Sequence, residues 1–385
     1  MHLKGLLIYL NIPWKQTGKI KKALSGLKMC FTVLIIFLLA SRLSAIQAQI
    51  LKDTSAVNLI RKGIGFIYNC RFDDAEKIRD SLERLYPRHP VHHLYRGMMI
   101  YWQNFPLTPS SPARASYENE LHKCIELTDN NNFPNPDYEA EYLLANLSAR
   151  GLLLLFYADN GVSSEVIPLA THTYKPLRKS FSFTDECPDL YFFTGIYNYY
   201  RDAYPKYRPV YKTVAFLFPL GDMKKGIEQL ELCGLKSMAL KAEAYSMLAW
   251  IRMHFETDWQ KSLPYCKLLF EYYPGNPNFK GMYIKNLMLL KKYDEAERIM
   301  NIDSPADTNP YYRAEQMLFN ALLQEKKYRN YEEAKALYRE AINAMLVFGE
   351  YGKEFQSYAY FGLSRITPKD EVKQLSDFRK MTFDD

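Results

Sequence analysis

Apolar residues recur every three to four positions from residue 52 to residue 365, with charged and polar residues between them. This spacing is typical of amphipathic α-helices, which bury one face and expose the other. No Asn-Gly or Asp-Gly turn lies between two segments that alternate apolar and polar residues, so the sequence gives no sign of a β-hairpin. The pattern therefore predicts an all-α protein.

The predicted helices come in pairs. Residues 56–87 contain two amphipathic helices joined at residues 69–72, and Pro87 ends the second because proline cannot continue a helix. Gly63 and Ala75 are small, and we expect the two helices to cross closely there. This segment therefore predicts a helix–turn–helix unit.

The spacing of Gly63, Phe72, Ala75 and Pro87 resembles the tetratricopeptide repeat, a helix–turn–helix unit of about 34 residues. The same register recurs three times in the second half of the chain. The corresponding residues are Trp259, Ser262 and Pro274, then Tyr293 and Ala296, and finally Tyr331 and Ala334.

The period between Ser262 and Ala296 is 34 residues, whereas Ala334 follows Ala296 by 38, so residues 303–310 are expected to carry an insertion. The sequence departs from the repeat pattern at three further positions. Trp250 and Ile284 stand where the family prefers glycine, and Glu325 stands where it prefers an aromatic residue.

Three less regular helix pairs are predicted over residues 90–127, 136–180 and 188–234. The resemblance implies a right-handed α-solenoid of about seven tetratricopeptide-like pairs over residues 49–367, each burying its apolar faces against its neighbours. Residues 368–385 are then a charged C-terminal cap or tail.

The charge of the chain is concentrated at its N-terminus. Residues 1–48 hold seven cationic side chains and no carboxylate, which leaves 43 cations and 43 carboxylates in the rest. A basic body would favour nucleic acid or an anionic membrane as partner. Because the remainder is formally neutral, we expect no nucleic-acid partner.

Residues 1–48 resemble a secretory leader, because a lysine-rich segment precedes the apolar run Cys30–Ala40 and a small-residue region follows. Cleavage is expected after Ala48 or Ala45, with export to a periplasm or cell envelope. The apolar run is shorter than the ~20 residues that span a bilayer. An uncleaved anchor reaching past Arg42 is the alternative, and Met29 is an alternative start.

The cysteines beyond the leader are odd in number, widely spaced and without a C-x-x-C pair. This favours buried, unpaired cysteines over disulfides or a metal site. They are Cys70, Cys124, Cys187, Cys233 and Cys266.

The sequence offers no catalytic or metal-binding set. His89, His92 and His93 cluster, but Pro90 interrupts the helix on which ligation at i and i+4 depends. Hydrolase, metalloprotease, P-loop and dinucleotide-binding motifs are absent. We therefore expect neither an enzyme nor a bound metal or cofactor.

Some tetratricopeptide proteins hold acidic tails through lysine and asparagine side chains of their first helices. In this sequence the matching groove positions are mostly apolar, and only Lys285 fits that pattern. A carboxylate clamp is therefore disfavoured. The apolar positions are Val57, Ile60, Ile64, Ala244, Met247 and Ile251.

Residues 194–213 contain six tyrosines and four basic side chains. Tyr197, Tyr200 and Tyr204 share one helical face, and the following residues, beyond Pro205, are expected to form a long connection. Packing of buried rings is one interpretation, and a surface for a ligand or partner is the other. The candidate contact residues are Tyr200, Arg201, Tyr204, Tyr207, Arg208 and Tyr211.

The repeats, the leader and the absence of a catalytic set favour a non-enzymatic scaffold that holds a protein partner or peptide segment on its concave face in the bacterial cell envelope. The alternative is an exported binder of glycans or small molecules that uses the aromatic surface around residues 197–211.

Overall fold

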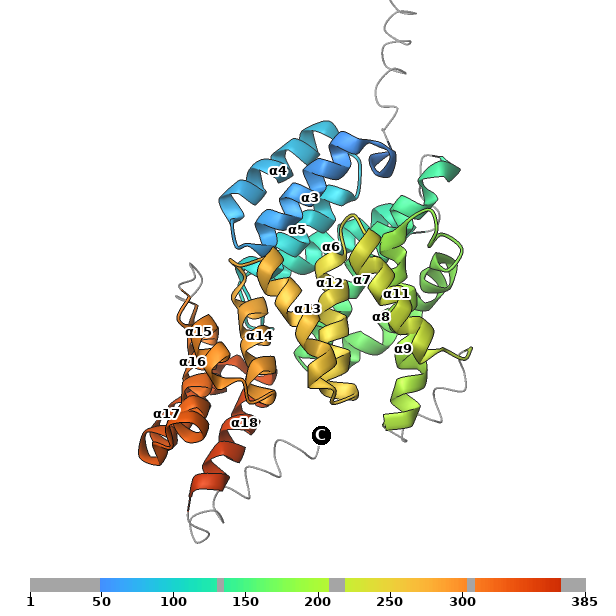
Figure 1. The fold of residues 1–385 in the computed structure, drawn as a ribbon. Helices are drawn as coiled ribbons and strands as arrows, with labels where there is room; N and C mark the ends of the chain where they lie inside the picture. The colour runs from blue at the N-terminus through green and yellow to red at the C-terminus, as the bar shows by residue number, and fades with distance from the viewer. Residues whose placement is uncertain (1–48, 130–134, 208–218, 303–308, 368–385) are drawn as a thin grey trace, which may run out of the picture. The chain divides into compact units, whose positions relative to one another are not determined.

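The computed structural model describes residues 49–129, 135–207, 219–302 and 309–367 (Figure 1). All of them belong to one compact unit, residues 49–385. The described residues form fifteen α-helices and no β-strand, which confirms the all-α prediction. The leader, the tail from residue 368, and the candidate residues Arg208 and Tyr211 lie outside the described residues.

The helices form seven consecutive pairs, followed by α18 (Glu350–Ile366). Each helix packs against the next along the chain, and α3, α5 and α7 also contact one another in turn, as do α14, α16 and α18. The pairs are α3 (Thr54–Tyr68) with α4 (Phe72–Leu85), α5 (Val91–Gln103) with α6 (Arg114–Thr128), α7 (Glu139–Asp159) with α8 (Ser163–Ser180), α9 (Tyr191–Tyr207) with α11 (Met223–Lys236), α12 (Lys241–Trp250) with α13 (Trp259–Tyr272), α14 (Pro277–Leu289) with α15 (Tyr293–Met300), and α16 (Pro310–Leu323) with α17 (Tyr331–Met345).

The expected crossing of α3 and α4 is present. A Cβ atom added to Gly63 would lie 2.6 Å from the hydroxyl oxygen of Tyr95 and 2.7 Å from Ile78. Ala75 is fully buried, and its carbonyl accepts a hydrogen bond of 3.0 Å from the Tyr95 hydroxyl. The two small residues therefore let α3 and α4 pack closely and leave room for the Tyr95 side chain of α5.

Two first helices of pairs end in a π-helical turn, η6 (Ile251–Phe255) after α12 and η8 (Gln324–Tyr328) after α16. A π-turn contains one residue more than a regular helical turn. Because of this extra residue in η6, the small residue that packs against Ser262 is Ala249 rather than residue 250. Ala249 is fully buried and accepts a hydrogen bond of 3.1 Å from the Ser262 hydroxyl.

The same shift occurs in the last pair, where Ala321 precedes Ala334 by thirteen residues and both are fully buried. Pro87 and Pro274 each follow shortly after the end of α4 and α13, as predicted. Ile284 in α14 remains a true departure from the pattern, because a large apolar side chain is fully buried there.

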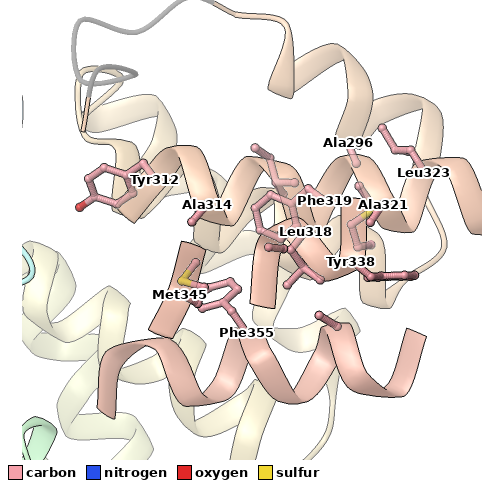
Figure 2. Close-up of a cluster of buried hydrophobic side chains, with 14 of the residues drawn as sticks. Ala296, Tyr312, Ala314, Leu318, Phe319, Ala321, Leu323, Tyr338, Met345 and Phe355 are labelled. Carbon is pink, nitrogen blue, oxygen red and sulfur yellow. The ribbon is translucent and has the colours of Figure 1, made fainter. Parts of the chain in front are cut away.

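The core of the last helices joins α15, α16, α17 and α18. Figure 2 shows Leu318 and Phe319 of α16 among side chains of the neighbouring helices, including Ala296, Tyr338 and Phe355. Tyr338 of α17 has no exposed surface, and its ring lies against Gly362 of α18.

Every cysteine of the described residues is unpaired, as the sequence predicts. Four are buried, and burial raises the pKa of the Cys70 thiol to about 11 and that of Cys266 to about 12. These cysteines are therefore poor nucleophiles at neutral pH.

Candidate functional site

The tyrosine-rich segment begins as helix α9, whose position is fixed by close packing on α11. A Cβ atom on Gly226 would lie 2.6 Å from the backbone nitrogen of Tyr199 and 2.8 Å from the carbonyl oxygen of Gly195. The backbones of the two helices thus touch. Pro205 lies inside α9, which continues to Tyr207, so the connection expected beyond Pro205 begins after residue 207.

The three tyrosines that share a face of α9 have different environments. Tyr197 packs beside Tyr174 and Phe181, and its hydroxyl donates to the carbonyl of Pro219 at 2.8 Å. Its ring therefore belongs to the packing between α8 and α9.

Tyr200 and Tyr204 point toward the first helix of the next pair. Their rings lie 5.1 and 5.7 Å from the ring of Phe255 in η6, and 5.2 Å from each other. The Tyr200 hydroxyl contacts the sulfur of Met247 in α12 at 3.3 Å. Tyr204 keeps 42% of its surface exposed, so it is the tyrosine of this group that can reach a ligand.

The other two candidate residues on α9 are Arg201 and Tyr207. Arg201 has its guanidinium 3.7 Å from the carboxylate of Asp202 and a mostly buried side chain. Tyr207 is the last residue of α9 rather than part of the following connection. The structure therefore brings Tyr200, Arg201, Tyr204 and Tyr207 onto one helix.

A second cluster, which we call the Lys285 network, joins the π-turn η6 at the end of α12, helix α14 and the last helix, α18. Lys285 of α14 donates to Nε2 of His254 in η6 at 3.2 Å and to Oε1 of Glu354 in α18 at 2.5 Å. The Tyr358 hydroxyl donates to the same oxygen of Glu354 at 3.0 Å. The Trp250 ring stacks on His254 with a centroid separation of 3.8 Å.

The ammonium of Lys285 also lies 5.9 Å from the centre of the Trp250 ring and 5.6 Å from that of Tyr358, within the range of cation–π attraction. Trp250 keeps 42% of its surface exposed. The Trp250 ring is therefore partly exposed to solvent, while His254 stacks on it and Lys285 lies within cation–π range.

Burial and neighbouring charges determine which groups of the Lys285 network carry a proton. Burial, and then the positive charge of Lys285, lower the pKa of His254 to about 4. Burial alone would raise the pKa of Glu354, but the charges of Lys285 and His254, and the hydrogen bonds from Lys285 and Tyr358, lower it. At neutral pH the ring of His254 is neutral and accepts a hydrogen bond from Lys285, whereas Glu354 is a carboxylate.

Glu315 of α16 lies next to this network without joining it. Its side chain is 4% exposed, its Oε2 atom makes no hydrogen bond, and a Cβ atom on Gly281 would collide with its carboxyl group. Burial raises its pKa to about 8, although Lys285 partly opposes this. It is therefore a protonated acid at neutral pH.

Several positions expected to line a groove are buried instead. Ile60, Ala244 and Ile251 have almost no exposed surface because each packs in an apolar core shared by several helices. They are unable to contact a partner. Lys285, the one basic residue that the sequence places in the groove, is already paired with Glu354.

The histidine cluster separates in the structure. His89 accepts from the Val91 amide at its Nδ1 atom, which places the ring proton on Nε2, and that atom lies 2.5 Å from Oε1 of Glu141. His93 instead contacts Glu120 at 2.6 Å. Both rings thus tie neighbouring helices together, and no group of three potential metal ligands occurs within the described residues.

Among the described residues, no helix combines the length and the apolar character needed to cross a bilayer. Comparison with known protein families finds no family that matches this chain, and comparison with curated proteins finds no significant match.

Proposed function

We propose that this chain is a non-enzymatic scaffold of the tetratricopeptide type, exported to the cell envelope, that holds a protein segment on the face formed by the first helices of its pairs. In a solenoid of such repeats these first helices line the concave face. Seven consecutive helix pairs, with small residues at the crossings of several of them, support this assignment.

One observation carries the proposal. Trp250 and Tyr204 are exposed aromatic residues on the first helices of successive pairs, and each is held in place by a second ring. Rigid aromatic side chains of this kind are enriched at the centres of protein interfaces. Their supports, His254 and Tyr200, are packed into the fold, so the surface is ordered before a partner arrives.

A photo-crosslinking amino acid tests this surface. It is introduced at Tyr204, at Trp250 and, as a control, at Leu235, which is 70% exposed on the second helix α11. The proposal expects one envelope protein to crosslink at the first two positions and not at the third. Equal crosslinking from all three positions argues against the scaffold. So does a protein that stays monomeric and crosslinks to no envelope protein from any of them.

The exposed rings also support a second candidate, an exported binder of glycans or small molecules. Sugar rings stack on aromatic faces, and the charged groups beside Trp250 are able to bond hydroxyl groups. Calorimetry with a glycan panel, comparing the protein with Trp250→Ala and Tyr204→Ala, distinguishes the two. Heat of binding that either substitution abolishes favours this candidate, and its absence favours the scaffold.

Cell fractionation and N-terminal sequencing test the export proposal. An N-terminus at Gln49 or Ile46 in an envelope fraction supports a cleaved leader, an intact N-terminus in the membrane fraction supports the anchored alternative, and recovery in the cytosol overturns export.

A further inference from the structure

Residues 104–113 connect α5 to α6 and link two parts of the molecule, the early helices α3–α7 and the late helices α13–α18. Leu107 is fully buried in the core of the early helices, and its carbonyl accepts a hydrogen bond of 3.1 Å from the side chain of Asn160. The carbonyl of Phe105 instead accepts a hydrogen bond of 2.8 Å from the side chain of Asn309, which lies 204 residues further along the chain. The connection is therefore anchored on the early helices and reaches the late helices through Phe105.

The ring of Phe105 lies among four aromatic side chains, which we call the four-ring site. Trp102 of α5 and Tyr312 of α16 stack on it, with centroid separations of 5.5 and 5.8 Å and interplanar angles of 20° and 10°. Tyr311 of α16 and Tyr351 of α18 lie at steep angles to it, each with a centroid separation of 5.7 Å. Aromatic pairs prefer these stacked and edge-to-face arrangements. The four-ring site therefore fits a flat ring.

Asn309 holds the carbonyl of Phe105 in a fixed direction. It is the N-cap residue of α16, and its Oδ1 atom accepts a hydrogen bond of 2.9 Å from the Tyr311 amide, which leaves its Nδ2 atom to donate to Phe105. Helices α16 and α18 also contact each other, as the successive first helices α14 and α16 do. The chain's own segment therefore lies on the late first helices as a bound segment of another protein would, with one ring and one carbonyl recognised.

The ring of Phe105 closes the four-ring site from the surface of the molecule. Phe105 is only partly buried, whereas Tyr311 and Tyr312 are each 5% exposed. Its neighbours Gln103 and Asn104 are exposed, and Phe105 lies in a connection rather than in a helix. Movement of this one segment would therefore uncover the four-ring site without unwinding a helix.

Other contacts hold the early helices against the late ones. The Gly275 amide donates to the side chain of Asn69 at 3.1 Å across 206 residues. The ring of Tyr68, at the end of α3, lies 5.5 Å from the ring of Phe279 in α14. These contacts do not involve Phe105, so they are able to keep the early and late helices together when its ring leaves the four-ring site.

We propose that the four-ring site binds an aromatic side chain from an extended segment of a partner protein, and that Phe105 is an internal occupant which this segment displaces. The partner residue places its ring in the four-ring site and its carbonyl on Asn309. Phe105 is thus an autoinhibitory contact. This inference rests on the proposed function, because it names the kind of segment that the first helices hold, but it involves neither Tyr204 nor Trp250.

Occupation by Phe105 lowers the apparent affinity of the four-ring site for any other segment. A site that is free in only a fraction of the molecules binds with an affinity reduced by that fraction. The connection keeps the ring of Phe105 at an effective concentration on the order of millimolar, as short linkers do. A separate segment should therefore bind the native protein weakly, and about tenfold or more tightly once the ring is removed.

Fluorescence anisotropy with a labelled synthetic peptide tests this displacement. The probe is the chain's own segment, residues 103–109, which carries the phenylalanine and no charged side chain. Its dissociation constant should be about tenfold or more lower for the protein variant Phe105→Ala than for the native protein. A peptide carrying Phe105→Leu should bind the Phe105→Ala protein about tenfold more weakly than the native peptide, because leucine has no flat ring to stack.

Phe270→Ala is the matched control protein. Phe270 is also a partly buried ring on the core of the late helices, but it packs on Tyr283 and not in the four-ring site. This variant should bind the peptide no better than the native protein does. Equal affinities of the native and Phe105→Ala proteins, equal affinities for the two peptides, or no binding by folded Phe105→Ala each overturn the proposal.

Circular dichroism establishes whether each variant is folded. If Phe105→Ala is not, the protein variant Phe105→Leu replaces it, since leucine keeps an apolar side chain at this position. It should also bind the native peptide more tightly than the native protein does, and unchanged binding overturns the proposal. If neither variant folds, Phe105 is an indispensable part of the core rather than a displaceable occupant, and the proposal is wrong. Crosslinking from Tyr204 and Trp250 is measured separately, so a failure of the proposed function is distinguishable from a failure here.

Discussion

Arg365 of α18 donates two hydrogen bonds to the carboxylate of Glu325, from Nε at 2.8 Å and from Nη2 at 2.7 Å. Glu325 lies on the π-turn η8, is almost fully buried, and also accepts from the Tyr338 hydroxyl at 2.5 Å. A tetratricopeptide repeat would carry an aromatic residue at this position. Here a bidentate ion pair, rather than a ring, fixes α18 on the last helix pair.

Replacing the cation of this pair should destabilise the protein. Arg365→Met leaves the buried carboxylate of Glu325 without its main partner, which costs about 1–3 kcal/mol in the free energy of unfolding. The measurement is chemical denaturation followed by circular dichroism. The double variant Glu325→Met with Arg365→Met should recover much of the loss, because no charge is left unpaired. A single variant as stable as the native protein would contradict the role of the pair.

The same pair predicts a stability that depends on acid. Burial by itself raises the pKa of Glu325, but hydrogen bonds from Arg365, Lys326 and Tyr338 lower it to about 2. The ion pair therefore contributes fully above the ordinary value near 4.5 and is lost as the pH falls through about 2. Glu325→Gln should be less stable than the native protein at neutral pH, and the difference should shrink on acidification. A constant difference would exclude the mechanism.

Two glycines form a matched pair for a packing test. A Cβ atom on Gly362 of α18 would collide with the ring of Tyr338, which is fully buried and held by Glu325. Gly362→Ala should cost about 1–3 kcal/mol through overpacking. Gly65 of α3 has no atom within 4 Å of the same position, so Gly65→Ala should stabilise by about 0.5–1 kcal/mol. Equal thermal shifts for the two variants would contradict this packing.

The helix pairs were predictable because each depends on apolar spacing and on small residues close together in the sequence. A π-turn shifted the period at Trp250, so Ala249 rather than residue 250 supplies the small side chain, whereas Ile284 departs from the pattern in a helix without such a turn. A π-turn replaces i→i+4 by i→i+5 hydrogen bonds, and no residue type specifies it, so its position is not predictable from the sequence.

The candidate site was predictable only in part. Lys285 and the tyrosines of α9 were identified from the sequence, but the partners of Lys285 lie 31 and 69 residues away along the chain. Such contacts depend on how several pairs stack, and local spacing does not report that. The spacing of four between Trp250 and His254, and between Glu354 and Tyr358, was the available sign of a shared helical face.

The Lys285 network predicts how the fluorescence of Trp250 changes with pH. An imidazolium stacked on an indole quenches its emission, and the pKa of His254 is lowered to about 4 from 6.5. Emission should therefore fall as the pH passes through about 4, while circular dichroism confirms that the protein is still folded. His254→Gln should abolish the transition, and the part of the emission change that disappears in this variant is then assigned to Trp250 rather than to the other tryptophans.

Two substitutions should move this transition in opposite directions. Burial and the charge of Lys285 lower the pKa of His254, whereas the charge of Glu354 raises it. Lys285→Met should therefore move the midpoint up toward 6.5, and Glu354→Gln should move it further down. Midpoints that coincide in the two variants would show that burial alone sets the protonation of His254. Opposite shifts would establish that the three helices η6, α14 and α18 share one electrostatic site, since each group that acts on His254 comes from a different helix.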